Sequence, residues 1–219
     1  MFESLQGKYN LWSVFTDWLE MASITFENII LKDPEKEKRY LEIYNKYSKK
    51  EQEIFPKILG ELIMAFDKEY EDHLGKIYME MSIYNKGTGQ FFTPYNLSKL
   101  TAQLVGIEEK ATITIDEPAV GSGGMVIAYA EHLLKKGINP QSRLIISASD
   151  KDINCVRMSH IQLSILGLRA KIFHRDTLAM NTWKVIYTPF YYAPASSYTK
   201  RKEPETNKEG VYKLFQEVG

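Results

Sequence analysis

Two short segments, about 25 residues apart, carry the residue types that bind a nucleotide-like cofactor. The first is Gly89-Gln90-Phe91-Phe92-Thr93-Pro94, and the second is Ile115-Asp116-Glu117-Pro118-Ala119-Val120-Gly121-Ser122-Gly123-Gly124. The second segment is typical of a strand that ends in an acid, turns through a glycine-rich loop and enters a helix. Glycine in the loop allows close approach of a ligand, because a Cβ there would collide. The first N–H groups of the helix can bind a carboxylate.

Two further acids follow predicted strands. Asp150 ends the second strand, where a carboxylate can accept hydrogen bonds from both ribose hydroxyls of an adenosine. The alternative is a helix N-cap, because Lys151-Asp152-Ile153 opens the next helix. Asp176 and Thr177 follow the third strand, where a carboxylate could bind the amino group of an adenine ring. A turn-forming Asp is the alternative at 176.

The composition limits the classes of function. Hydrophobic residues make up 44% of the 219 residues, which is enough for a packed core. The single Cys155 excludes an internal disulfide framework and a cysteine-based zinc cluster, and we expect no metal site. The chain has no signal peptide and no apolar run of about 18 residues or more, so we expect a cytoplasmic protein without a membrane span.

The charge is balanced overall but not between the two halves of the chain. The net charge of zero argues against a free-standing nucleic-acid binder held by phosphate contacts. Residues 1–110 contain 14 basic and 18 acidic side chains, a balance of −4, whereas residues 111–219 contain 14 and 10, a balance of +4. Any polyanion contact is therefore expected on the second half, although ordinary surface variation explains so small a difference more often.

The elements that must position these residues divide the chain near residue 85. Residues 1–85 place apolar side chains at helical spacing, as in Leu11, Phe15 and Trp18, and Asp33-Pro34 predicts a capped helix start. Residues 86–192 alternate helices, at 97–105, 123–136 and 152–166, with strands, at 111–116, 143–148, 171–174 and 183–187. Short connections between them imply parallel βαβ units. Residues 193–219 form a C-terminal tail.

The ordered motifs resemble those of N6-adenine DNA methyltransferases, most closely the modification subunit of type I restriction-modification systems. The resemblance covers about residues 72–191 and includes His73-Leu74-Gly75-Lys76-Ile77-Tyr78, which is similar to the helix before the first motif. Glu117 stands where the family usually has Asp, and Val120 where Cys is common. The resemblance implies an α/β, Rossmann-like S-adenosylmethionine-dependent methyltransferase fold, truncated after strand four, with an N-terminal helical region. It implies that S-adenosylmethionine is bound by Phe92, Thr93, Pro94, Glu117, Pro118, Gly121, Ser122, Gly123, Asp150, Asp176 and Thr177.

The catalytic motif departs from the family pattern. The family has Asn or Asp, then Pro, Pro and an aromatic residue after the fourth strand, where they hold the target amine and stack on the flipped base. This chain has Thr188-Pro189-Phe190-Tyr191 there, so the resemblance assigns catalysis to Thr188, Pro189 and Tyr191. The Thr188 hydroxyl can accept a hydrogen bond, but it is shorter than an Asn side chain and aimed differently. A misplacement of about 1 Å can cost about a hundredfold in rate.

Two classes of function follow, with a third beside them. The first is a DNA adenine-N6 methyltransferase of a restriction-modification or mobile-element context, minimal or dependent on a partner. The second is a weak or inactive homologue that acts as a cofactor-binding regulatory or partner-docking module. The third is methylation of another amine, with Thr188 and Tyr191 shaping a different pocket.

The short carboxyl end predicts an exposed sheet edge beyond strand four, which a homodimer or a partner protein would cover. We expect only weak DNA contact by this chain alone. Lys200-Arg201-Lys202 could touch phosphate, although a solvated tail is the alternative.

Overall fold

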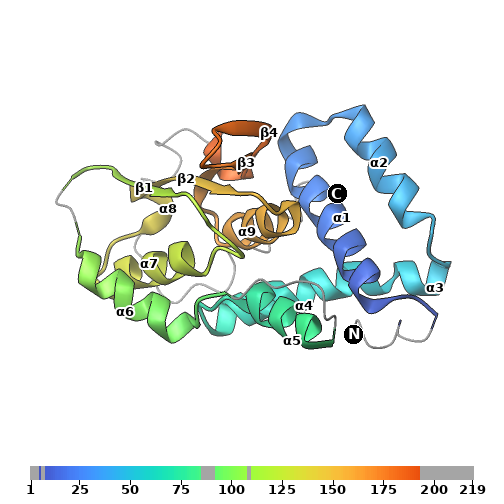
Figure 1. Cartoon of the computed structure of the whole chain (residues 1–219), viewed down its shortest axis with the longest axis horizontal. Helices are drawn as coiled ribbons and strands as arrows, with labels where there is room; N and C mark the ends of the chain where they lie inside the picture. The colour runs from blue at the N-terminus through green and yellow to red at the C-terminus, as the bar shows by residue number, and fades with distance from the viewer. Residues whose placement is uncertain (1–4, 6–7, 85–91, 108–109, 193–219) are drawn as a thin grey trace.

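The computed structural model describes residue 5 and residues 8–84, 92–107 and 110–192 of the chain (Figure 1). The described elements are, in chain order, α1 (Leu11–Leu31), α2 (Pro34–Tyr44), α3 (Lys49–Gln52), α4 (Ile54–Lys68), α5 (His73–Tyr84), α6 (Tyr95–Val105), β1 (Ile113–Glu117), α7 (Gly124–Lys135), α8 (Pro140–Arg143), β2 (Leu144–Asp150), α9 (Ile153–Ile165), β3 (Arg169–Asp176), β4 (Asn181–Tyr187) and the 3₁₀ turn η2 (Pro189–Tyr191). The predicted α/β class with an N-terminal helical region is confirmed.

The N-terminal helices begin where side chains can cap them. The Asn10 side chain accepts a hydrogen bond from the backbone N–H of Ser13 at the start of α1. Asp33 caps α2 in the same way, with Pro34 in the first turn, as the sequence predicts. One face of α1 is buried, including Phe15 and Trp18, and it packs against α9. The N-terminal helices are therefore joined to the α/β part by a continuous core.

The sheet has the strand order β1-β2-β3-β4. β1 pairs with β2 and β2 with β3, both in parallel, and Ile115, Ile146 and Ala170 lie side by side across the three strands. The carboxyl ends of three parallel strands meet at one edge of a sheet, so Glu117, Asp150 and Asp176 end together there. This edge is where the sequence predicts the cofactor site.

The fourth strand corrects the prediction that all strands are parallel. β4 runs antiparallel to β3, pairing Asp176 with Asn181 at one end and Lys171 with Tyr187 at the other. A parallel pair needs a crossover of a dozen or more residues, whereas β3 and β4 are joined by residues 177–180 alone. Met180 in this turn adopts a left-handed backbone with φ +55°. A connection so short can form only a hairpin.

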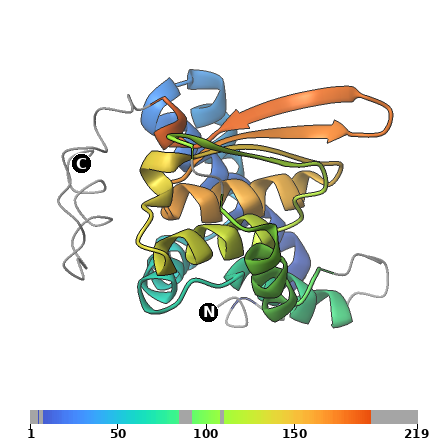
Figure 2. The same ribbon diagram turned by 90° about the vertical axis from the view of Figure 1, so that its left-hand side faces the viewer.

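Helices α7 and α9 lie against one face of the sheet (Figure 2). Leu144, Ile146 and Ala148 of β2 point into that layer and are fully buried. No helix of the described residues lies against the opposite face (Figure 2). In the described part of the chain, no helix is long and apolar enough to cross a membrane. The domain limits at 85 and 192 stay predictions, since residues 85–91 and the tail at 193–219 lie outside the described residues.

Candidate cofactor site

The glycine loop after β1 brings three of the predicted cofactor residues together. Gly121 has a left-handed backbone, φ +55°, and its N–H donates to Asp150 Oδ2 at 2.9 Å. A Cβ added at Gly121 would lie 3.1 Å from the Phe92 ring, so the loop fits closely beneath that ring. Gly123 also has a positive φ, and α7 begins directly after it. Phe92, Gly121 and Asp150 thus meet at the carboxyl end of the parallel strands.

Asp150 serves the loop, whereas the neighbouring Asp152 is the helix cap. Asp152 accepts a hydrogen bond from the backbone N–H of Asn154 at 2.7 Å and caps α9. Asp150 Oδ1 accepts from the Asp152 N–H at 2.9 Å. Each Asp150 oxygen therefore holds one backbone N–H, and a carboxylate oxygen can accept one more hydrogen bond. Asp152, not Asp150, is therefore the N-cap of α9, and the remaining acceptor sites of Asp150 can bind a ribose.

Asp176 forms a turn, which is the second of the two roles that the sequence suggests for it. Its Oδ1 accepts from the backbone N–H groups of Leu178 and Ala179 at 3.1 and 3.0 Å, and Lys151 pairs with Oδ2 at 2.8 Å. The Lys151 ammonium and these N–H groups hold the pKa of the Asp176 carboxyl below its usual value. Thr177 Oγ1 donates to the Pro118 carbonyl at 2.9 Å and ties the hairpin to the glycine loop. Both residues stand at the predicted edge of the sheet, in structural roles.

The other predicted residues differ in exposure. Glu117 is half-buried, and its Oε1 accepts from the Ala119 N–H at 3.2 Å. Thr93 and Pro94 are exposed, and the Pro94 carbonyl accepts from Leu97 and Ser98 at the start of α6. Ser122 is buried under the loop, with 1% of its surface exposed. Glu117, Thr93 and Pro94 are therefore open to a ligand, whereas Ser122 holds the loop from beneath.

Sequence reasoning missed a buried acid that holds the glycine loop from the other side. Asp72, 6% exposed, accepts hydrogen bonds from the Ser122 hydroxyl, from Gln162 Nε2 at 2.8 Å and from the Gly75 N–H at 2.9 Å. Gln162 Nε2 also donates to the Ser122 carbonyl at 2.7 Å, and its Oε1 accepts from the Leu74 N–H. The start of α5, the loop and α9 are thereby locked together. The one signal in the sequence is an acid directly before a helix start.

A row of aromatic rings supports the loop from the N-terminal helices. The Trp12 and Tyr78 ring centroids are 5.1 Å apart, and those of Tyr78 and Phe92 are 4.9 Å apart. Tyr78 is fully buried, and burial raises the pKa of its hydroxyl. Burial also raises the pKa of the Cys155 thiol on α9, which therefore stays protonated and is no nucleophile. These aromatic residues pack the site rather than react in it.

The three predicted catalytic residues lie at the opposite end of the sheet, which corrects their placement. Because β4 is antiparallel, Thr188 comes beside Ala170, near the beginning of β3. From there to Asp176 is roughly 20 Å at about 3.3 Å per strand residue. The Thr188 hydroxyl is fully buried, donates to the Leu168 carbonyl at 2.7 Å and accepts from the Ala170 N–H at 2.9 Å. Thr188, Pro189 and Tyr191 therefore cannot reach a cofactor on the glycine loop of the same chain.

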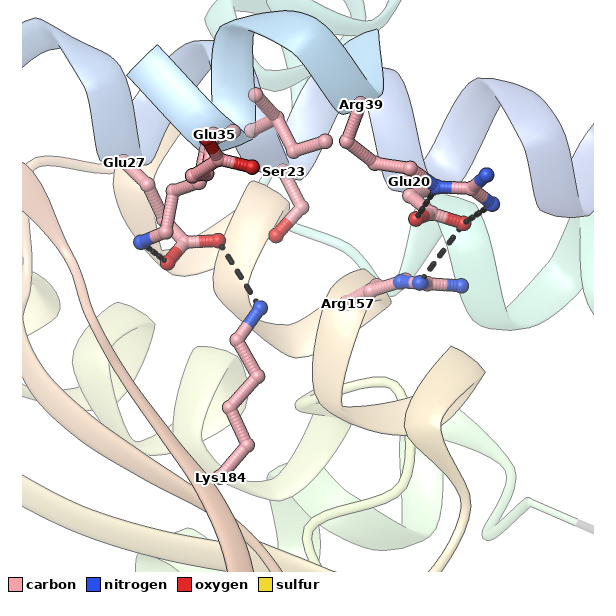
Figure 3. A pocket seen from close by; sticks show the side chains of 9 residues that line it. Glu20, Ser23, Glu27, Glu35, Arg39, Arg157 and Lys184 are labelled. Carbon is pink, nitrogen blue, oxygen red and sulfur yellow. Dashed lines mark hydrogen bonds and ion pairs between the residues drawn. The ribbon is translucent and has the colours of Figure 1, made fainter. Parts of the chain in front are cut away.

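A charged cleft of about 210 Å³ lies elsewhere, between α1, α2, α9 and β4 (Figure 3). Glu27 at 3% side-chain exposure pairs with Lys36 and with Lys184, the latter at 3.5 Å. Glu20 pairs with Arg39 at 2.8 Å and with Arg157 at 3.0 Å. The acids and bases thus satisfy one another. The cleft joins the N-terminal helices to the α/β part and is no candidate for a ligand.

A buried histidine makes the same connection. His160 Nε2 donates to the Tyr187 carbonyl at 3.1 Å, so its Nδ1 accepts from the Ser23 hydroxyl at 2.9 Å. This links α1, α9 and the end of β4. Burial lowers the pKa of His160 to about 4, and the ring is neutral at pH 7.

Comparison with known proteins agrees with the loop geometry. The model of the family described as N-6 DNA Methylase matches residues 66–207, well over half of the chain. The chain belongs to this family. It is 32% identical over 108 residues to the type I restriction enzyme MjaIX methylase subunit of Methanocaldococcus jannaschii. The match covers 49% of the chain and 18% of that relative, so the chain spans less than a fifth of its length.

A solved structure is also similar to the chain. The similarity covers 80% of this chain and 49% of a Listeria monocytogenes chain assigned to the class I S-adenosylmethionine-dependent methyltransferases, with 16% identity. The TM-score of 0.41 is too low to argue from.

The glycine loop leaves little room for side chains. Any residue other than glycine at 121 or 123 would have to adopt a left-handed backbone conformation. At 121, its Cβ would also contact the Phe92 ring. Asp150 presents free acceptor sites on the same side of the sheet. Among the described residues, no cluster of His, Cys, Asp or Glu could hold a metal ion. The residues present therefore fit an adenosine-containing ligand.

Proposed function

We propose that this protein is the S-adenosylmethionine-binding part of a DNA adenine-N6 methylation system and transfers methyl groups weakly or not at all by itself. The observation that carries the proposal is the meeting of Phe92, Gly121 and Asp150 on the glycine loop of a member of the N-6 DNA methylase family. When bound, S-adenosylmethionine would supply the methyl group. Asp150 would orient its ribose, and Phe92 would lie against it.

The position of Thr188 supports the second half of the proposal. Its hydroxyl is used inside the sheet, at the end far from the loop. Among the described residues, Thr188 therefore does not place its hydroxyl at the glycine loop, and we infer that another chain supplies the group that holds the target amine. A restriction-modification context is consistent with the Methanocaldococcus relative, which is named as a methylase subunit. DNA binding, a covering partner or second copy, and a cytoplasmic location remain predictions.

Two glycines give a matched test of the cofactor site. Gly121→Ala and Gly137→Ala both force a side chain into a positive φ, +55° and +73°, so both strain the backbone. Only position 121 faces Phe92, whereas a Cβ at 137 meets nothing within 4 Å. Titration calorimetry with S-adenosylhomocysteine should show binding that weakens at least tenfold in Gly121→Ala and stays unchanged in Gly137→Ala. Absence of binding by the folded wild type would contradict the cofactor site.

Methyl transfer is tested separately. Purified protein with tritiated S-adenosylmethionine and mixed double-stranded DNA should transfer little label. Addition of a full-length type I modification complex that lacks cofactor binding should raise transfer, because it would supply a group that holds the target amine. Rapid transfer by the purified chain alone would show that the catalytic group lies within it.

A further inference from the structure

One face of the sheet lacks a helix layer in the described part of the chain (Figure 2). Sheets of mainly parallel strands are normally covered on both faces. Ala170 and Ile172 of β3 point to the helices and are fully buried, so the alternate residues of β3 point the other way. We call this surface the open face. It consists of Arg169, Lys171, Phe173 and Arg175 of β3 together with Tyr187 of β4.

The open face combines cations and aromatic rings. Lys171 Nζ lies 4.6 Å from the centre of the Phe173 ring and 5.9 Å from that of Tyr187. The Arg175 guanidinium lies 4.7 Å from the Phe173 ring. These distances place the four side chains on one surface. At its end, the rings of Tyr191 and Tyr192 contact Tyr187 at 4.9 and 5.4 Å.

The cations of the open face are not neutralised by neighbouring acids. Among the described residues, Arg169, Lys171 and Arg175 form no ion pair with a carboxylate. Arg169 Nε and Arg175 Nε are buried and have no hydrogen-bond partner in that part of the chain. The alternation of β1 places Asp116 on the same face, two strands away, at roughly 10 Å for strands about 4.8 Å apart. The positive strip therefore follows β3.

The occupant that matches this surface is an extended polyanion with exposed flat rings. Alternate residues of a strand lie about 6.6 Å apart, so cations and rings succeed one another along β3. Cations bind the phosphates of a single strand, and aromatic side chains stack on its unpaired bases. A duplex hides its base faces, and an acidic peptide offers no matching rings. We propose that the open face binds single-stranded nucleic acid along β3 and β4.

The site is separate from the glycine loop and does not depend on cofactor binding. Its three cations are among the 14 basic residues in the second half of the chain. Tyr191 is too far from the glycine loop to contact a cofactor there, but it can take part in binding at the open face.

The test is fluorescence anisotropy with a labelled 20-nucleotide oligothymidine between 50 and 200 mM NaCl. For a single strand, each phosphate contact contributes about −0.7 to the slope of log affinity against log salt, so three cations predict about −2. Lys171→Gln should reduce that slope by about 0.7. Phe173→Leu should weaken binding about fivefold to a hundredfold at constant slope, since stacking on a base is lost.

The matched control is Lys135→Gln. Lys135 lies on α7, on the other side of the sheet, with 61% of its side chain exposed. The same charge is removed, and affinity and slope should not change. Far-ultraviolet circular dichroism and the melting temperature show that each variant is folded.

Four outcomes would overturn the proposal. The first is that the wild type does not bind the oligonucleotide at 50 mM NaCl, and the second is that folded Lys171→Gln and Phe173→Leu bind as the wild type does. A blunt duplex of equal length that binds as tightly as the single strand would also exclude it. Polyglutamate that displaces the oligonucleotide at equal charge concentration would assign the face to an acidic polypeptide instead. Retained S-adenosylhomocysteine binding in these variants would keep the two proposals apart.

Discussion

Gly75 on α5 allows a direct test of the hydrogen bonds by which Asp72 holds the glycine loop. A Cβ built at Gly75 would lie 2.1 Å from Asp72 Oδ2 and 2.6 Å from the Ser122 hydroxyl oxygen. In Gly75→Ala the carboxylate must move, and its hydrogen bond with Ser122 is lost. A hydrogen bond to a charged group contributes about 1.5–3 kcal/mol. Alanine returns up to about 1 kcal/mol through its higher helix propensity. We expect a net loss of about 1–2 kcal/mol.

Gly60 on α4 provides the control for that calculation. A Cβ at Gly60 meets nothing within 4 Å, so only the helix propensity changes. Gly60→Ala should therefore stabilise the protein by up to about 1 kcal/mol. The two variants carry the same substitution in helices of one protein. They should differ by about 1.5–3 kcal/mol, the value of the lost hydrogen bond, with opposite signs relative to the wild type.

Urea unfolding followed by circular dichroism measures both changes. For a protein of this size, about 1 kcal/mol corresponds to about 2–4 °C in melting temperature. Gly75→Ala should also weaken S-adenosylhomocysteine binding, because Ser122 carries the glycine loop, whereas Gly60→Ala should not. A Gly75→Ala protein as stable as Gly60→Ala would show that Asp72 does not hold the loop as described.

Three more predictions follow from buried polar groups. Thr188→Val should cost about 1–3 kcal/mol of stability, because the Ala170 N–H and the Leu168 carbonyl lose their partner, and Thr188→Asn should not raise methyl transfer. The pKa of His160 in the folded state is lowered to about 4, so its contribution to the free energy of unfolding is complete above about pH 6.5 and falls as the pH drops. Urea unfolding at pH 5 should therefore show about 2 kcal/mol less stability than at pH 7.5. His160→Gln should reduce that difference. Glu27→Gln should cost about 2 kcal/mol, measured the same way, since its two lysines lose a buried partner.

The geometry of the glycine loop could be predicted from the sequence because its signals are local. An acid at a strand end, a glycine loop and a helix start are each visible within a few residues, and parallel strands bring Glu117 and Asp150 to one edge. The Asp72 contacts could not be predicted. Its partners Ser122 and Gln162 lie 50 and 90 residues away, and no periodic pattern reports such a pairing.

The catalytic placement failed for a reason that the sequence also contains. The family order led to a fourth strand parallel to the others, although the connection after Asp176 is too short for a crossover. Once the hairpin forms, Thr188 must lie near Ala170 rather than near Gly121. The length of a connection was a better guide than the order of motifs.

The strand order leaves two edges at which the sheet could grow. In the described part of the chain, β1 has only β2 beside it and β4 has only β3. A strand from another polypeptide that joins parallel to β1 would end next to Glu117, at the mouth of the glycine loop. Sheet completion and delivery of a catalytic side chain would then be one event. Assembly itself would switch such an enzyme on, without any movement within this chain.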